Sequence, residues 1–169
     1  MVEATKVFKV FSGPCVAEGG LMSGLRAVQR SPHSQARSKQ EGDAMEIGRK
    51  AATVKGPSEW FTGEVFIDFL AQTHGASPAT VAHVHFTPGA RTAWHSHSVG
   101  QSLFVTEGEG RIQARGEPVI VLRPGDTVFA PGGEWHWHGA GPDHLMTHLA
   151  VSEGEAAWGD HVSDDEYQS

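Results

Sequence analysis

Two histidines one residue apart, His95 and His97, are followed four residues later by Gln101. Side chains two positions apart in a β-strand lie on the same face, so both imidazoles should point the same way. The segment "EWHWHG" repeats this arrangement with His136 and His138, about forty residues further on. Imidazole and carboxamide groups from two β segments are donors for a first-row divalent metal ion, although this donor set does not name the metal.

A second pair with the same spacing, His83 and His85, has different neighbours. The residues that alternate with this pair form a more apolar face and should line the core; they are Thr80, Ala82, Val84 and Phe86. We therefore predict that His83 and His85 point away from the core and are not metal ligands.

Short strands separated by turns must position these histidines. After residue 45, apolar or alternating segments are bounded by Gly and Pro; they include "GEVFIDFL", "ATVAHVHF", "GQSLFVTEGEG", "RIQARG", "PVIVL", "TVFA" and "HLMTHLAVSE". This pattern predicts an all-β sandwich or small barrel. "RPGD" predicts a Pro-Gly turn and "EGEG" predicts a hairpin. Ser163 and Glu166 have capping-box spacing, which predicts a short C-terminal helix.

Length and charge restrict the class of protein. The 169 residues are enough for one domain, and the 13 basic and 20 acidic residues give a net charge of −7. This balance argues against nucleic acid or an anionic membrane as the main partner. A single cysteine, Cys15, excludes an intrachain disulfide and fits a reducing compartment. No apolar segment approaches the ~20 residues that span a bilayer, so we expect a soluble protein, and we place it in the cytoplasm.

The first 44 residues differ from the rest of the chain. They carry six basic and four acidic residues, a net charge of +2, which leaves −9 for residues 45–169. Their Ser-, Arg- and Gln-rich composition predicts a disordered extension, and no apolar stretch suits a secretory signal. There are two alternatives to a disordered extension. The segment could be a transit peptide, or the true start of the protein could be Met45. The predicted folded domain comprises residues 45–169.

The spacing of glycines and histidines resembles the two motifs of the cupin superfamily. Gly89, His95, His97, Gln101 and Gly108 follow the first motif, with Gln101 in place of the usual glutamate. The second motif is matched by Gly125, Pro131, Gly133 and His136, with Ala140 in place of its final asparagine. The resemblance implies a single antiparallel jelly-roll β-barrel with a metal ion in its mouth. It also implies the metal ligands, which are His95, His97, Gln101 and His136.

Further blocks resemble the bacterial, manganese-dependent cupin-type hydroxynitrile lyases and their uncharacterised relatives, from about Gly56 to Tyr167; they include "GPSEWFTG", "PGARTAWHSH", "GEWHWHGA", "MTHLA" and "VSDDEY". This resemblance implies Mn²⁺, with Fe²⁺, Zn²⁺, Ni²⁺ and Co²⁺ as alternatives, and a homo-oligomer, either a dimer or a tetramer. It places His138, His148 and Thr92 in the reaction pocket. From strand parity, Ala82 and Val84 should form part of the pocket wall.

An uncharged Gln101 would leave the metal ion with its full double charge. Three neutral imidazoles and an amide do not offset this charge, so the ion should lower the pKa of a bound hydroxyl more than it would beside glutamate. In the alternative arrangement, Gln101 only hydrogen-bonds a bound water and the three histidines are the ligands.

The leading hypothesis for the reaction is cleavage of a cyanohydrin into an aldehyde and cyanide. His138, with a pKa near the unperturbed value of ~6.5, would remove the hydroxyl proton, and His148 or protonated His138 would stabilise the departing cyanide. Alternatively, His138 only orients a ligand or a water. Two other functions fit the same residues, a quercetinase-like dioxygenase and a non-enzymatic cupin that binds a small ligand.

Overall fold

The computed structural model describes residues 47–72 and 76–169. These residues all belong to one compact unit, residues 40–169. The predicted disordered extension, residues 1–44, lies outside the described residues. No helix among those described is long and apolar enough to cross a membrane.

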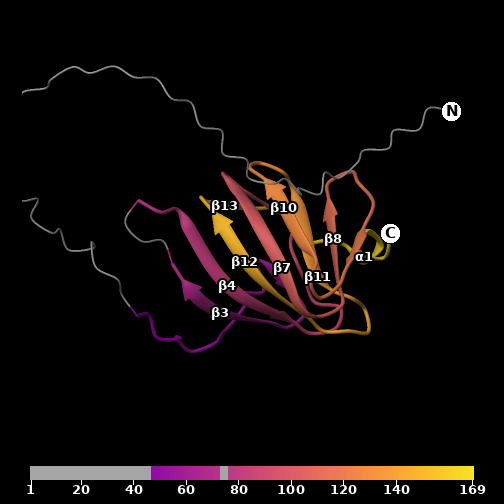
Figure 1. Ribbon diagram of the computed structural model, residues 1–169. Helices are drawn as coiled ribbons and strands as arrows, with labels where there is room; N and C mark the ends of the chain where they lie inside the picture. Colours follow the sequence, from indigo (N-terminus) through magenta and orange to yellow (C-terminus); the bar gives the residue numbers. More distant parts are fainter. Residues whose placement is uncertain (1–46, 73–75) are drawn as a thin grey trace, which may run out of the picture. The chain divides into compact units, whose positions relative to one another are not determined.

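The first of two antiparallel sheets has the strand order β1-β3-β4-β12-β7-β10. Its strands are β1 (Val54–Lys55), β3 (Val65–Ala71), β4 (Ala79–Phe86), β7 (Gly100–Gly108), β10 (Thr127–Pro131) and β12 (Met146–Glu153). Strand β12 is hydrogen-bonded to both β4 and β7 along its whole length. In Figure 1 these three strands run side by side. The sheet therefore brings together segments that are far apart in the sequence.

The second sheet has the order β13-β6-β11-β5-β2, with β8 paired to β11 and β9 paired to β8. Its strands are β2 (Phe61–Thr62), β5 (Arg91–Thr92), β6 (His95–His97), β8 (Gly110–Ala114), β9 (Ile120–Leu122), β11 (His136–Ala140) and β13 (Ala156–Trp158). Strand β11 contacts β5, β6 and β8, and it carries the second histidine pair. The expected all-β, antiparallel jelly-roll architecture is confirmed.

Strand parity follows the apolar pattern of the sequence. On β4, Val84 and Phe86 are buried and belong to the main core, against which Ala82 packs. The intervening His83 and His85 contact residues on the other side of the sheet, as predicted. The apolar side chains of β3, β7 and β12 complete this core because they alternate in the same way.

The segment "EGEG" is not a hairpin, which corrects the expectation from the sequence. Strand β7 pairs with β12 and β10, whereas β8 pairs with β11 and β9, so the chain crosses here from one sheet to the other. Gly108 has a φ of 78°, and a Cβ there would overlap the carbonyl oxygen of Leu145. Gly108 allows two backbone segments to approach closely at this corner of the barrel. The prediction failed because "EGEG" has the same Gly-rich composition as a hairpin turn.

The predicted turn and helix are both present. The amide of Asp126 donates to the Arg123 carbonyl across "RPGD", and Gly125 has a φ of 96°. Helix α1 (Asp164–Gln168) has Ser163 as its N-cap, in a capping box with Glu166.

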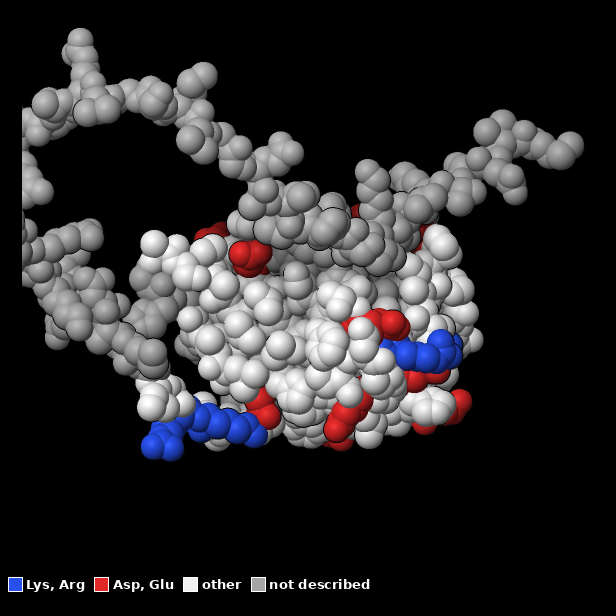
Figure 2. Space-filling view, in the orientation of Figure 1, with Lys and Arg blue, Asp and Glu red and all other residues white. Residues whose placement is uncertain are grey.

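Helix α1 fixes the end of β11. The hydroxyl of buried Tyr167 donates to the carbonyl of Ala140 at 2.8 Å. The guanidinium groups of Arg91 and Arg111 lie 4.6 and 5.0 Å from the Tyr167 ring centroid. The helix thereby holds the strand that carries His136 and His138. On the face shown in Figure 2, the described acidic and basic side chains are scattered, without an extended basic surface.

Candidate metal centre

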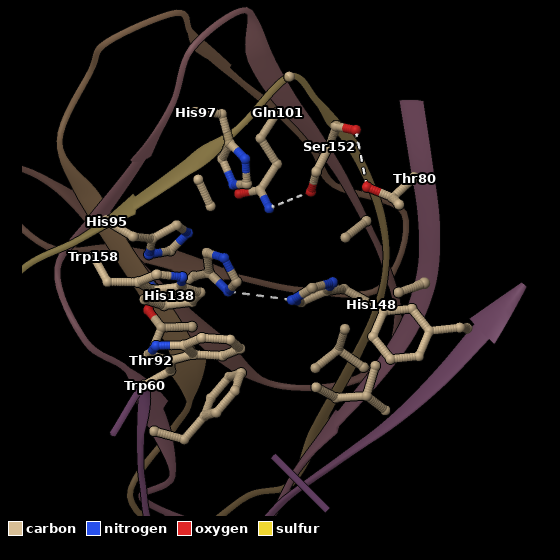
Figure 3. Close-up of a pocket in the computed structure, with 18 residues that line it drawn as sticks. Trp60, Thr80, Thr92, His95, His97, Gln101, His138, His148, Ser152 and Trp158 are labelled. Carbon is tan, nitrogen blue, oxygen red and sulfur yellow. Dashed lines mark hydrogen bonds between the residues drawn. The ribbon is translucent and has the colours of Figure 1, made fainter. Parts of the chain in front are cut away.

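All the predicted site residues except His136 line a cavity of about 290 Å³ between the two sheets. Imidazoles from β6, β11 and β12 face it, together with the Gln101 amide from β7 (Figure 3). The predicted wall residues Thr92, Ala82 and Val84 also line the cavity. The rest of the wall is mainly apolar and includes Phe61, Ile67, Phe69 and Ala150. A small molecule with an apolar body and one polar group fits this lining.

The rings of His95 and His136 are held in one orientation by backbone carbonyls. The two residues are register partners on β6 and β11, and their ring centroids are 4.4 Å apart. His95 Nδ1 donates to the Ala93 carbonyl at 3.1 Å, and His136 Nδ1 donates to the Glu134 carbonyl at 2.9 Å. Because a carbonyl only accepts, the Nε2 atom of each neutral ring keeps its lone pair. Metal-binding histidines are commonly oriented by such bonds.

The Gln101 amide faces the His136 ring with its oxygen. Its nitrogen donates to Ser152 Oγ at 2.9 Å, and its Oε1 lies 3.0 Å from His136 Nε2. With the amide in this orientation both facing atoms are acceptors when the ring is neutral, and a cation between them would satisfy both. Adjacent ligands of an octahedral ion with bonds of about 2.1 Å lie about 3.0 Å apart, so the observed separation fits a shared metal ion.

His97 has no hydrogen-bond partner for either ring nitrogen among the described residues, although both atoms are buried. Its ring centroid lies 5.4 Å from that of His95 and 6.2 Å from that of His136. Rings that bind one ion through bonds of about 2.1 Å have centroids no more than about 6.4 Å apart. The centroid separations of all three rings lie within this upper limit.

The three histidines whose donor atoms lie close together at the cavity are nevertheless a different set. Donor atoms of His95, His136 and His138 lie within 4.8 Å of one another, and His97 is not in this group. His95, His97 and Gln101 line the cavity and His136 contacts Gln101, but the group whose donor atoms lie close together has His138 in place of His97.

Buried imidazoles in this cavity are uncharged. Burial, followed by the proximity of His136, lowers the pKa of His95 to about 3 and that of His97 to about 4. Burial also lowers the pKa of His136 below its usual value. Neutral imidazole is the form that binds a metal ion, so the protonation state at neutral pH suits a ligand.

His138 and His148 form a buried pair across β11 and β12. His138 Nδ1 lies 3.2 Å from His148 Nε2, so one of these atoms carries the shared proton. The other nitrogen of each ring, His138 Nε2 and His148 Nδ1, is buried and has no partner among the described residues. The backbone N–H of His138 donates to Thr92 Oγ1 at 3.1 Å.

The expectation that His138 titrates near its unperturbed value is wrong. Burial is the main cause that lowers its pKa well below 6.5, and the neighbouring His148 lowers it further. Burial lowers the pKa of His148 to about 3. Both residues are therefore neutral at neutral pH, and His138 is a weak base with a lone pair available on one nitrogen.

Three residues of the site were not identified from the sequence. The Trp158 ring stacks on His95 with centroids 4.8 Å apart and on Trp60 with centroids 5.0 Å apart. Ser152 holds the Gln101 amide. Trp158 and His95 are register partners, but a pairing between β13 and β6 has no local sequence signal.

Comparisons with known proteins agree with this fold. Residues 82–152 match the cupin domain family. The chain is 49% identical over 130 residues to an (R)-mandelonitrile lyase of Granulicella tundricola, covering 73% of this chain and 99% of that protein. A cupin-like protein of Thermotoga maritima has 41% identity and a TM-score of 0.66, over 73% of this chain and 96% of that chain. An acetylacetone dioxygenase of Acinetobacter johnsonii has 17% identity and a TM-score of 0.59, over 78% and 87% of the two chains, and shows the fold alone.

Proposed function

Because this chain belongs to the cupin family, we propose that it is a metal-dependent carbon–carbon lyase of the hydroxynitrile-lyase type. It would cleave a cyanohydrin to an aldehyde and hydrogen cyanide, or catalyse the reverse addition. The observation that carries this proposal is the high identity to an (R)-mandelonitrile lyase along nearly the whole length of that protein. The buried pair of His138 and His148 beside the predicted metal ligands supports it.

The residues that would hold the metal ion are His95, His97, Gln101 and His136. Their neutral donors keep the charge of a divalent ion undiminished, and Mn²⁺ is the metal that we propose because it accepts an amide oxygen. When bound, the ion supplies Lewis acidity, which makes a nearby hydroxyl easier to deprotonate. This help is required because burial makes His138 a weak base.

His138 would accept the hydroxyl proton on Nε2, the atom that is buried without a partner. The electron pair of the broken carbon–carbon bond leaves with cyanide, and the hydroxyl carbon becomes the aldehyde. The proton then passes from His138 to cyanide, which forms hydrogen cyanide and returns His138 to its neutral state. His148 would stabilise the transient imidazolium by accepting a hydrogen bond from His138 Nδ1.

Thr92 would position the substrate oxygen. Its hydroxyl oxygen accepts the His138 backbone N–H, so the hydroxyl hydrogen remains for a group in the cavity. The apolar wall, with Phe61, Ile67 and Ala150, would hold the hydrocarbon part of the cyanohydrin. Trp60 and Trp158 would add an aromatic surface at the side of His95.

Benzaldehyde release from mandelonitrile tests this function. Metal-stripped protein reloaded with Mn²⁺ should release benzaldehyde without O₂, and the His138→Ala variant should lose about 10²–10⁴-fold in kcat at equal Mn²⁺ content. His144→Ala is the matched control, because His144 is an exposed histidine. Equal rates of benzaldehyde release by the unmodified protein and by His138→Ala would exclude His138 as the base. O₂ uptake with a phenolic substrate, without benzaldehyde release, would instead indicate a dioxygenase.

We also propose that the protein is a homo-oligomer, a dimer or a tetramer. Phe129 is 62% exposed on β10, which is an edge strand of the first sheet. An exposed edge with an apolar side chain favours pairing with another chain. Light scattering after size-exclusion chromatography should show the oligomer, and Phe129→Glu should shift it towards the monomer. A monomeric unmodified protein would contradict this proposal.

A further inference from the structure

A second cluster of potential metal ligands lies on the opposite side of the first sheet from the cavity. Ligand atoms of Asp68 on β3 and of His83 and His85 on β4 lie within 4.8 Å of one another. Asp68 and His83 are register partners, so the cluster joins the two strands. We propose that these three residues form a second metal site, separate from the cavity, for a divalent cation such as Zn²⁺.

The His83 ring has a defined tautomer. The Thr106 hydroxyl donates to the Thr147 carbonyl at 3.1 Å, so its oxygen is left to accept from His83 Nε2, which is 3.1 Å away. His83 Nδ1 therefore carries the lone pair that a metal ion requires. Neighbouring hydrogen bonds orient metal-binding histidines in this way.

The contact between His85 and Asp68 also fits a shared ion. His85 Nε2 lies 3.5 Å from Asp68 Oδ2, which is beyond the range of a good hydrogen bond. Two ligands of a tetrahedral zinc ion with bonds of about 2.0–2.1 Å lie about 3.3 Å apart. His85 Nδ1 lies 3.3 Å from Thr147 Oγ1, which can accept its proton and leave Nε2 free to bind.

The charge states of the cluster suit a cation. A hydrogen bond from Thr53, followed by one from Lys50, lowers the pKa of Asp68 to about 2, so its carboxylate is ionised. Burial, followed by the proximity of His85, lowers the pKa of His83 and keeps its ring neutral. Two imidazoles and one carboxylate form a donor set that binds Zn²⁺ and its neighbours in the first row.

Lys50 is the present counter-ion of this cluster. Its ammonium lies 2.9 Å from Asp68 Oδ2, and its side chain is 59% exposed. The Asp68 side chain is only 10% exposed, but the exposed ammonium can return to solvent when a divalent ion binds in its place. Removing the lysine should therefore strengthen metal binding, a result that a purely structural polar cluster does not predict.

Zinc titration of the metal-stripped, full-length protein tests the site. Calorimetry and elemental analysis should give two Zn²⁺ per chain, falling to one in the His83→Ser/His85→Thr variant and remaining at two in the His144→Ser control. Lys50→Met should raise the affinity of the outer site by roughly 3–10-fold, and Asp68→Asn should lower it.

Either of two results would overturn the proposal. One is an unchanged zinc stoichiometry in the double histidine variant. The other is a stoichiometry of one in the unmodified protein that is lost in His97→Ala, because zinc would then bind only in the cavity.

Discussion

His97 carries two ring nitrogens that are buried and have no hydrogen-bond partner among the described residues. A buried polar group left without a partner costs about 1–3 kcal/mol, so a bound metal ion would remove a real penalty here. We predict that protein purified without added metal contains a divalent ion in the cavity and that His97→Ala loses most of this cavity ion, whereas any ion in the outer cluster is retained. Elemental analysis of the two proteins measures this directly.

The matched control for that experiment is His144→Ala, which removes an exposed histidine. Its metal content should equal that of the unmodified protein. Equal metal content in His97→Ala and the unmodified protein would remove His97 from the ligand set. The same measurement on Gln101→Ala distinguishes an amide ligand from an amide that only hydrogen-bonds a water.

The buried histidines also predict a pH dependence of stability. Burial lowers the pKa of His148 to about 3 and that of His97 to about 4, whereas an unfolded chain titrates near 6.5. Below about pH 6.5 the unfolded chain therefore binds protons that the folded chain does not. The contribution of these buried histidines to the free energy of unfolding is fully present above about pH 6.5 and declines as the pH falls towards about 4. We predict a lower Tm for the metal-free protein at about pH 5 than at about pH 7.

Each such histidine contributes at most about 1.4 kcal/mol per pH unit in that window. His148→Leu removes one of them, so its Tm should depend less steeply on pH. A slope equal to that of the unmodified protein would show that His148 titrates alike in the folded and unfolded chains.

Part of the site could be predicted from residue spacing. The positions of His95, His97, Gln101 and His136 follow from motif spacing, and the structure places the first three on the cavity wall, with His136 in contact with Gln101. The low pKa values could not be predicted, because they depend on burial from several strands at once. Trp158 was also missed, since nothing in its own neighbourhood of the sequence indicates that it stacks on His95.

Among the elements, strands with clear alternation were predicted well and the crossover was not. The alternation on β4 correctly separated Ala82 and Val84 from His83 and His85. The hairpin predicted at "EGEG" was wrong because a Gly-rich turn has the same composition whether its two strands pair with each other or with other strands. Pairing is decided by contacts with β11 and β12, which lie far away in the sequence.

Gly108 at this crossover should be sensitive to substitution. A Cβ at this position would overlap the Leu145 carbonyl, and the φ of 78° is unfavourable for any other residue. We predict that Gly108→Ala lowers the free energy of unfolding by about 3 kcal/mol or more, from overpacking and backbone strain together. Urea denaturation measures this change.

Gly125→Ala is the matched control for Gly108→Ala. Gly125 has a φ of 96° but no atom within 4 Å of an added Cβ, so only backbone strain applies. Gly125→Ala should therefore lower the free energy of unfolding by about 1–2 kcal/mol. If both variants lost the same free energy, the close approach to Leu145 would contribute nothing.

For the whole molecule, the sequence predicted the fold family but not the outer cluster. Two motifs in the right order were enough for the antiparallel barrel, because their glycines and histidines mark its turns and its cavity. The outer cluster depends on Asp68 standing opposite His83 across β3 and β4, a register that the sequence does not specify. Asp68 is therefore distant from the pair of His83 and His85 in the sequence and lies beside it only in the folded chain.

The domain boundary gives a prediction for the molecule as a whole. The described strands begin at β1 (Val54–Lys55), and the cavity residues that the structure describes all lie after this strand. We propose that residues 45–169 fold and bind metal without the first 44 residues. A chain that starts at Met45 should match the full-length protein in metal content, in benzaldehyde release and, within about 0.5 kcal/mol, in the free energy of unfolding. A clear loss of stability or metal on truncation would show that the N-terminal residues contribute to the folded domain.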